Sequence, residues 1–329
     1  MKLKIKGIFT SALLALAGAG FVSNVGASDT AFPSRMVSII VPTTPGGTAD
    51  ILGRLIGPKL AEMWGQSVVV ENKPGAGTLV GTDYFARAKP DGHTLMVTFN
   101  ELATLPAINK NAKVDVVNDF VRVGKIGSLP VAILTHPRFP ANTLQELIAE
   151  LKASPGKYTY SSNGSGGVLQ LYTEMFKQEA KVDIMHVPYR GALEASTALL
   201  AGEVDVLVQF ASGNVQGYVT SGRAKALAVA SPNRLPGLPD VPTTAEGNLP
   251  SLQLEAWYGI FAPDGTPKAI VDKVNQDVAR VLQMPDIQKR LAGIGMSVQT
   301  GTPEEFDEFF RSEYQRWTTL IKNAGIESN

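Results

Sequence analysis

Two glycine-rich turns, each set between a strand-like run and a helical pattern, constrain this chain more than any other feature. The first lies in the string VPTTPGGTAD at residues 41–50, and the second in the string YSSNGSGGV at residues 160–168. A turn of this kind leaves backbone N–H groups unpaired at the positive end of a helix dipole, where proteins bind anions. A glycine turn also serves any tight bend, but two of them in one chain favour a shared anionic ligand.

Strand-like and helical patterns alternate along the chain. Apolar residues recur at helical spacing after the first turn, and a valine-rich run at 67–71 is typical of a strand covered on both faces. The alternation predicts an α/β fold with two similar sheets, each flanked by helices. We expect strands at residues 36–41, 67–71, 94–99, 130–135, 158–161, 184–187, 204–210, 224–230 and 252–262, and helices at 51–64, 78–88, 143–153, 168–180, 191–201, 267–284 and 303–323.

The C-terminal part has too few strands for a sheet of its own, so we expect it to return to the first sheet. The chain then crosses between two lobes twice, near residues 121–129 and 253–258. Two crossings form a hinge, and ligands of such proteins bind in the cleft between the lobes. We assign residues 28–127 and 254–329 to lobe 1 and residues 128–253 to lobe 2.

The first 27 residues have the pattern of an export signal. Lysines at positions 2, 4 and 6 precede an apolar stretch at residues 8–22, and Val25 and Ala27 are the small residues that a signal peptidase reads. The apolar stretch is about fifteen residues long, whereas a membrane span needs about twenty, so a retained anchor is disfavoured. We expect export, with cleavage after Ala27.

Charge and composition exclude several classes of function. The 30 basic and 30 acidic side chains balance, whereas a nucleic-acid-binding protein needs a basic face. The chain has no cysteine, which excludes thiol catalysis and zinc–thiolate sites. His93, His136 and His186 lie in turn or strand contexts, and no acidic or histidine cluster has the spacing of a metal site. We expect no catalytic residue, no metal and no cofactor.

Six segments, in order along the chain, resemble one known family. They are VPTTPGGTAD at 41–50, VVVENKPGAGT at 68–78, KPDGHTL at 89–95, VPYRG at 187–191, GRAKALAV at 222–229 and WYGIFAPDGTP at 257–267. These strings resemble the Bug family, also called TctC-like, the periplasmic receptors of tripartite tricarboxylate transporters. The resemblance implies a two-lobed, type II periplasmic binding protein fold that closes on a small carboxylate and delivers it to integral membrane transporter subunits. We expect a monomer.

The resemblance also implies which residues bind. In this family the ligand carboxylate is held mainly by backbone N–H groups and small hydroxyls of two loops, one from each lobe. Charge-assisted hydrogen bonds of this kind contribute about 1.5–3 kcal/mol each. The matching positions are Thr44, Gly46, Gly47 and Thr48 in the first loop and Ser162, Asn163, Gly164, Gly166 and Gly167 in the second.

Five more residues follow strands in the second half of the chain, and ligands of open α/β sheets bind at the carboxyl ends of strands. Tyr189 offers an apolar face and a hydroxyl, and Arg190 is the positive candidate next to it. A surface arginine that caps the next helix is an equally good interpretation of Arg190. The other three, Gln209, Phe210 and Ala211, are expected to set specificity.

Two acidic residues lie near the expected site. Asp50 stands in a first helical turn, where the dipole favours an acid, so we interpret it as a structural cap. Glu101 follows the strand 94–99 where relatives usually have a small neutral loop, and Gln170 stands where many relatives carry a histidine. A solvated Glu101 is the simpler interpretation. A Glu101 that faces the cleft would disfavour a doubly anionic ligand and favour an amino acid or another ligand with a cation.

Two other functions use the same features. A ligand-dependent partner of a sensor kinase would employ the same closing cleft, so the sequence does not separate sensing from transport. A periplasmic hydrolase with Ser161 or Ser165 as its nucleophile is the second alternative. Against it, the chain has no GxSxG motif and no histidine in a recognisable order with either serine.

Overall fold

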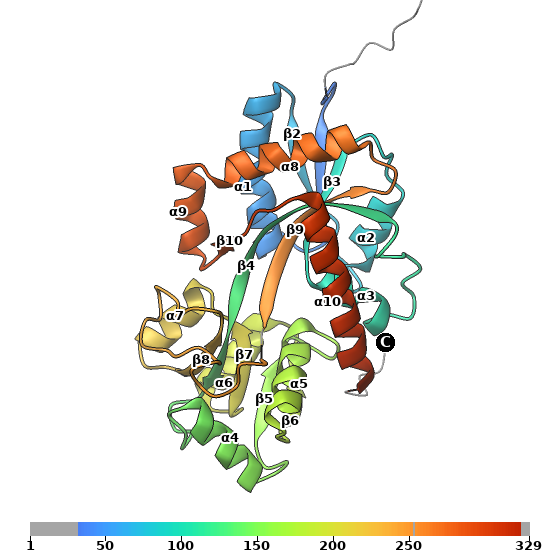
Figure 1. Ribbon diagram of the computed structural model, residues 1–329. Helices are drawn as coiled ribbons and strands as arrows, with labels where there is room; N and C mark the ends of the chain where they lie inside the picture. Colours follow the sequence, from blue (N-terminus) through green and yellow to red (C-terminus); the bar gives the residue numbers. More distant parts are fainter. Residues whose placement is uncertain (1–31, 253, 324–329) are drawn as a thin grey trace, which may run out of the picture. The chain divides into compact units, whose positions relative to one another are not determined.

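Two long antiparallel strands, β4 (Phe120–Thr135) and β9 (Glu255–Pro263), run through the middle of this fold (Figure 1). The computed structural model describes residues 32–252 and 254–323. β9 pairs with β4 as far as Pro130, and beyond that point β4 continues between β7 and β8. Strands and helices gather around each end of this pair, which gives the two-lobed α/β fold expected from the sequence.

The first lobe is built on a sheet with the strand order β2-β1-β3-β9-β4. β1 (Val37–Val41) lies parallel to β2 (Val68–Asn72) and to β3 (Thr94–Phe99), whereas β3 is antiparallel to β9. Successive side chains point to opposite faces, so Ile39 and Ile40 pack into different cores. The helices are α1 (Thr48–Trp64) and α8 (Lys268–Leu282) on one face, and α2 (Leu79–Ala86), α3 (Glu101–Ile108) and α10 (Pro303–Asn323) on the other. A further helix, α9 (Pro285–Gly293), precedes the short strand β10 (Ser297–Val298), which pairs with β4.

The second lobe continues the sheet from β4 in the order β7-β5-β6, with β8 on the other side of β4. β5 is parallel to both of its neighbours, so the carboxyl ends of β5, β6 and β7 meet at one edge. These strands are β5 (Thr159–Ser162), β6 (Met185–Pro188), β7 (Val206–Phe210) and β8 (Lys225–Ala230), and the helices of this lobe are α4 (Leu144–Ala153), α5 (Val168–Ala180), α6 (Ala192–Ala201) and α7 (Gly213–Thr220).

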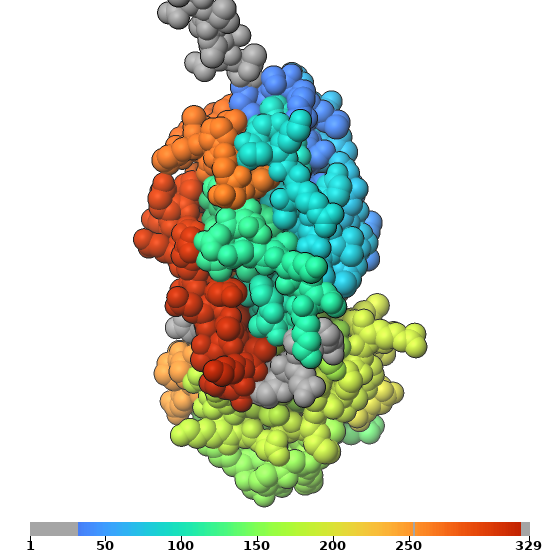
Figure 2. All heavy atoms as spheres, turned by 90° about the vertical axis from the view of Figure 1, so that its right-hand side faces the viewer, coloured from blue at the N-terminus to red at the C-terminus, as the bar shows by residue number. Residues whose placement is uncertain are grey.

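Helix α10 packs against β4 and β9 and contacts both lobes. Trp257 on β9 is fully buried, with its ring 5.8 Å from that of Phe310. The indole Nε1 groups of Trp257 and Trp317 both donate to one carboxylate oxygen of Glu313, at 3.2 and 2.9 Å. Trp317 in turn packs against Tyr172 of α5, with ring centroids 5.6 Å apart. Figure 2 shows the red residues of α10 extending from the cyan part of the surface to the yellow-green part.

The sequence-based expectations miss the helices α3, α7 and α9 and the strand β10. These helices are short, and Pro106 in α3 and the glycines at 213 and 217 in α7 lower the intrinsic helix propensity, so tertiary packing forms them. β4 also begins at Phe120 instead of at residue 130, because its first part pairs with β9. The two sheets are therefore continuous through β4, whereas the sequence predicted them as separate.

The predicted export signal at residues 1–27 lies outside the described part of the chain, which begins at Phe32. Among the described helices, none combines the length and the apolar character that a membrane crossing needs. The lobe boundaries expected near residues 127 and 253 fall within β4 and just before β9, the strands that pass between the lobes.

Replacing Glu313 with leucine would leave the indole N–H groups of Trp257 and Trp317 without their acceptor. Since a buried unsatisfied donor costs about 1–3 kcal/mol, we expect Glu313→Leu to lower the free energy of unfolding by about 2–4 kcal/mol. Glu313→Gln keeps an acceptor oxygen and should cost about half as much or less. Urea unfolding measures the difference. Glu308→Leu, at an exposed position of the same helix, is the matched control, and an equal loss in both leucine variants would contradict this account.

Candidate functional site

The first glycine turn connects β1 to α1 and presents bare backbone amides. Thr44, Gly46 and Gly47 are exposed, Thr48 is partly buried, and Gly46 has φ +87°, a conformation that favours glycine. Within the described residues, the amides of Gly47, Thr48 and Ala49 donate no hydrogen bond. These three N–H groups stand at the positive end of a 17-residue helix.

Asp50 lies beneath this turn and holds its shape. Its carboxylate accepts hydrogen bonds from the Gly46 amide (2.9 Å), from Arg54 Nε (2.9 Å) and from Asn72 Nδ2 (3.0 Å). Burial would raise the pKa of Asp50, but the hydrogen bonds from Arg54, Gly46 and Asn72 outweigh it and hold that pKa below its usual value. Asp50 therefore has the contacts of a structural cap, and the Gly46 amide is already engaged.

The second glycine turn connects β5 to α5 and satisfies most of its own amides. Asn163 Oδ1 accepts from the Leu169 amide at 3.1 Å, and Gln170 Oε1 accepts from the Gly166 amide at 2.6 Å. The Gly167 amide donates to Gly164 O at 3.1 Å, and Gly164 has φ +116°. The two loops thus differ, because the first leaves its helix N-terminus open while side chains cap the second.

Ser162 supports the second turn from below. Its side chain is fully buried, and its Oγ lies 2.6 Å from His186 Nε2 and 3.1 Å from Gly164 O. The His186 ring stacks on Tyr160 at 4.9 Å, and burial lowers the pKa of the imidazole. Ser161, considered above as a nucleophile, is also buried and donates its hydroxyl to a backbone carbonyl of α6. The Ser162–His186 contact is visible only in the structure, since it depends on the pairing of β5 with β6.

The residues that follow β6 differ in exposure. Tyr189 is partly buried, and its amide donates to Ser162 O at 3.1 Å. Arg190 is exposed, and its amide donates to Glu194 Oε2 at 3.1 Å, in the first turn of α6. The backbone of both residues is therefore fixed beside the second turn.

The three candidates at the end of β7 point in different directions. Gln209 is buried, and its side-chain amide donates to Ser196 Oγ at 3.2 Å and to a backbone carbonyl of α6. Ala211 is fully buried, with its amide bonded to Pro130 O at 2.8 Å. Phe210 is partly buried and packs edge-on against Tyr172 at 6.1 Å. Phe210 is therefore the one of these three whose side chain is not enclosed within the second lobe.

A wall between the two turns is formed by α3 and by Tyr258 of β9. The Tyr258 ring stacks on Phe99 at 5.6 Å. Burial raises the pKa of its hydroxyl, a hydrogen bond with the Thr48 side chain lowers that pKa in part, and the charge of Glu101 raises it further. At its other end, α3 approaches the second turn, since a Cβ atom on Gly166 would lie 3.7 Å from Ile108.

The polar link between this wall and the second lobe runs through Tyr172. Its hydroxyl accepts from Asn100 Nδ2 at 3.1 Å and donates to Glu255 O at 3.1 Å. Asn100 and Tyr172 are both fully buried. The segment before α3 is therefore bonded to α5 and β9 at the place where the lobes meet.

Glu101 is the acidic group that stands without a partner in this wall. Its side chain is partly buried at the start of α3, and within the described residues its carboxylate has no hydrogen bond and no ion pair. Burial raises its pKa from 4.5 to about 7. Three or more potential metal ligands are nowhere grouped in the described ranges.

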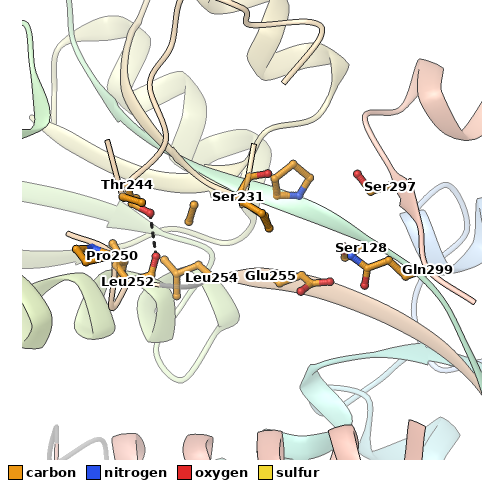
Figure 3. Close-up of a pocket in the computed structure, with 13 residues that line it drawn as sticks. Ser128, Ser231, Thr244, Pro250, Leu252, Leu254, Glu255, Ser297 and Gln299 are labelled. Carbon is orange, nitrogen blue, oxygen red and sulfur yellow. Dashed lines mark hydrogen bonds between the residues drawn. The ribbon is translucent and has the colours of Figure 1, made fainter. Parts of the chain in front are cut away.

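A cavity of about 220 Å³ lies on the other face of the hinge strands (Figure 3). In the β4–β9 ladder Ser128 pairs with Trp257, whereas Gly127 pairs with Tyr258. The side chains of Ser128 and Tyr258 therefore lie on opposite faces of the ladder. The cavity extends from Thr244 and Leu252 at one end to Ser297 and Gln299 at the other, and none of the predicted ligand-binding residues lines it.

Comparison with known proteins identifies one family. The model described as tripartite tricarboxylate transporter family receptor, TctC, matches residues 52–326. The protein BugT of Bordetella pertussis is 32% identical over 327 residues, which cover 99% of this chain and 98% of that protein.

Solved structures share the fold. The periplasmic binding protein BugD is 32% identical, with a TM-score of 0.75, over 91% of this chain and 100% of that one. MatC from Rhodopseudomonas palustris with bound malate is 33% identical, with a TM-score of 0.74, over 88% and 100%. A further R. palustris protein, with adipate, is 30% identical, with a TM-score of 0.78, over 91% and 100%. The family and these neighbours are solute-binding receptors, not enzymes.

The two turns respond differently to an added methyl group. A Cβ atom on Gly167 would lie 2.4 Å from Asn163 Oδ1, whereas one on Gly47 meets nothing closer than 3.7 Å. Both glycines precede a helix with extended backbone, so loss of the glycine N-cap is common to both. We expect Gly167→Ala to cost about 1–2 kcal/mol of unfolding free energy more than Gly47→Ala, because it displaces the Asn163 cap. Urea unfolding of the two variants tests this, and equal losses would contradict it.

Glu101 should make the unliganded protein less stable as pH rises. Between pH 4.5 and about 7 the Glu101 carboxyl group is more protonated in the folded state than in the unfolded state. The free energy of unfolding therefore falls as the pH rises through that window. Glu101→Gln removes this dependence, and we expect it to be more stable than the wild type by about 1–3 kcal/mol at pH 8 and equal to it at pH 4. Urea unfolding at both pH values measures this, with the exposed Glu308→Gln as control. A constant difference at both pH values would contradict the burial of Glu101.

Proposed function

This chain belongs to the tripartite tricarboxylate transporter receptor family, and on that premise we propose that it captures a small organic carboxylate between its lobes and delivers it to a membrane transporter. The bare amides of Gly47, Thr48 and Ala49 carry the proposal. Malate and adipate, the ligands of the two R. palustris neighbours, are both carboxylates.

The first loop is the primary anchor in this proposal. Charge-assisted hydrogen bonds from three convergent N–H groups bind a carboxylate without an arginine, provided that water is excluded. Thr44 and the Thr48 hydroxyl add small polar groups beside these amides. The second loop engages afterwards, when a ligand oxygen replaces Gln170 Oε1 at the Gly166 amide, 2.6 Å away in the present arrangement.

Closure of the lobes supplies the exclusion of water. We assign residues 28–127 and 254–329 to one lobe and 128–253 to the other, with β4 and β9 as the hinge. Closure brings Ser162, Asn163, Gly164, Gly166 and Gly167, together with Tyr189, Arg190 and Phe210, toward the first loop. Gln209 and Ala211 act from within the lobe by fixing the end of β7.

The cellular setting follows from the family. We place the protein in the periplasm as a monomer, exported by residues 1–27 with cleavage after Ala27. Its partners in this proposal are a small carboxylate and integral membrane transporter subunits. No chemistry on the ligand is required, because capture and release need only the opening and closing of the cleft.

A thermal-shift screen against mono-, di- and tricarboxylates, aromatic acids and acidic amino acids tests the proposal. A ligand at a hundred times its dissociation constant stabilises the folded state by about 2.7 kcal/mol. We expect Gly47→Leu to fold, because a Cβ atom there meets nothing closer than 3.7 Å. We expect it to lose at least tenfold in affinity for any such ligand, because the longer side chain would cover the amides. Gly217→Leu, at another open and exposed glycine, should bind as the wild type does. Undiminished binding by Gly47→Leu would refute the assignment of the first loop.

A further inference from the structure

We propose that the ligand of this cleft carries a cationic group, such as an ammonium, beside its carboxylate, and that Glu101 binds that cation. This inference rests on the proposed function and gives the ligand a chemical class, that of amino acids and related zwitterions. It is carried by the position of one unpartnered carboxylate in the wall between the two loops.

The position of Glu101 is set by the strand and helix on either side. β3 ends at Phe99, whose ring stacks on Tyr258, and α3 begins at Glu101 after the buried Asn100. Tyr258 is linked to the first loop by a hydrogen bond with the Thr48 side chain, and the far end of α3 approaches the second loop, since a Cβ atom on Gly166 would lie 3.7 Å from Ile108. Glu101 therefore begins the helix that runs from the neighbourhood of Tyr258 and the first loop to the second loop.

Within the described residues, Glu101 forms no ion pair. The carboxylates that influence the pKa values of Tyr258 on β9 and Tyr172 on α5 are Glu101, Glu313 and Glu255. The cation on the neighbouring hinge strand, Lys125, is bound to Glu255 at 2.9 Å. Burial is the cause that raises the pKa of Glu101, with no contribution from a nearby charge.

A partly buried carboxylate without a partner is unfavourable in the free protein, and a ligand ammonium relieves that cost by forming a charge-assisted hydrogen bond. A dicarboxylate would meet the opposite situation. Its second carboxylate would repel ionised Glu101 and could bind only if Glu101 took up a proton. The two ligand classes therefore predict opposite pH dependence, because affinity for a zwitterion rises as Glu101 ionises and affinity for a dicarboxylate falls.

Matched ligand pairs that differ only in an amino group test the inference. The pairs are L-aspartate with succinate, L-glutamate with glutarate, and L-leucine with 4-methylpentanoate, each measured by isothermal titration calorimetry on the purified wild type at pH 6 and pH 8. We expect at least one amino acid to bind tenfold or more tightly than its deaminated partner at pH 8. That preference should be smaller at pH 6, where more of Glu101 is protonated.

Glu101→Gln is the decisive variant, since it keeps the shape of the side chain and removes the charge. We expect it to reduce the preference for the amino acid at least tenfold and to abolish its pH dependence. Glu308→Gln, at an exposed site on α10, should leave both unchanged.

The outcomes separate this inference from the proposed function. Tighter binding of the deaminated acids or an unchanged preference in Glu101→Gln would overturn the role of Glu101. Carboxylate binding that still depends on Gly47 would meanwhile leave the receptor assignment in place. Failure of the folded wild type to bind any carboxylate, with or without an amino group, would overturn both.

Discussion

The antiparallel ladder between β4 and β9 is the interaction on which the rest of this structure depends. β4 continues from this ladder into the second lobe, where it pairs with β7 and β8, so both lobes take their orientation from it. The register of the pairing shifts twice, between Arg122 and Gly124 and between Lys125 and Gly127, and pairing continues after each shift. Trp257, buried under α10, fixes one face of the ladder, and Tyr258, the next residue, faces the proposed ligand site on the other.

The two glycine turns have similar sequences but do not present the same chemistry. Asp50 holds the first turn from beneath and takes up only the Gly46 amide, which leaves the first amides of α1 bare. In the second turn Gln170 takes up the Gly166 amide in the same way, but the Gly167 and Leu169 amides are also engaged, by Gly164 O and by Asn163 Oδ1. A helix N-terminus attracts an anion only where nothing in the chain already neutralises it. The asymmetry therefore suggests an order of events, with capture on the first loop and rearrangement of the second.

The sequence predicted the parts of this molecule that depend on local chemistry. The glycines of both turns, the strand before each and the helix after each follow from neighbours in the chain, and the structure has them where they were expected. Asp50 could be interpreted as a cap because it stands in the first turn of a helix, where the dipole favours an acid. The α/β class and the two-lobed arrangement followed from the order of the elements and from the family resemblance.

What the sequence could not supply depends on contacts between distant residues. Glu101 was singled out, but the short helix that it begins contains a proline. Tyr258, whose pKa the charge of Glu101 raises, is more than 150 positions away on β9. The contact between Ser162 and His186 requires the parallel register of β5 and β6. Gln170 was noted as a departure from the family pattern, yet its hydrogen bond to Gly166 appears only once the turn is folded.

The shared carboxylate of Glu313 has a consequence for how movement of the lobes can be observed. Two of the three tryptophans in the chain, Trp257 and Trp317, donate to it, and Trp317 also rests on Tyr172 of the second lobe. A rotation of that lobe changes the surroundings of Trp317 while Trp257 stays with the hinge strand. The protein thus contains its own optical probe, and the intrinsic emission of the unlabelled chain should report closure in real time.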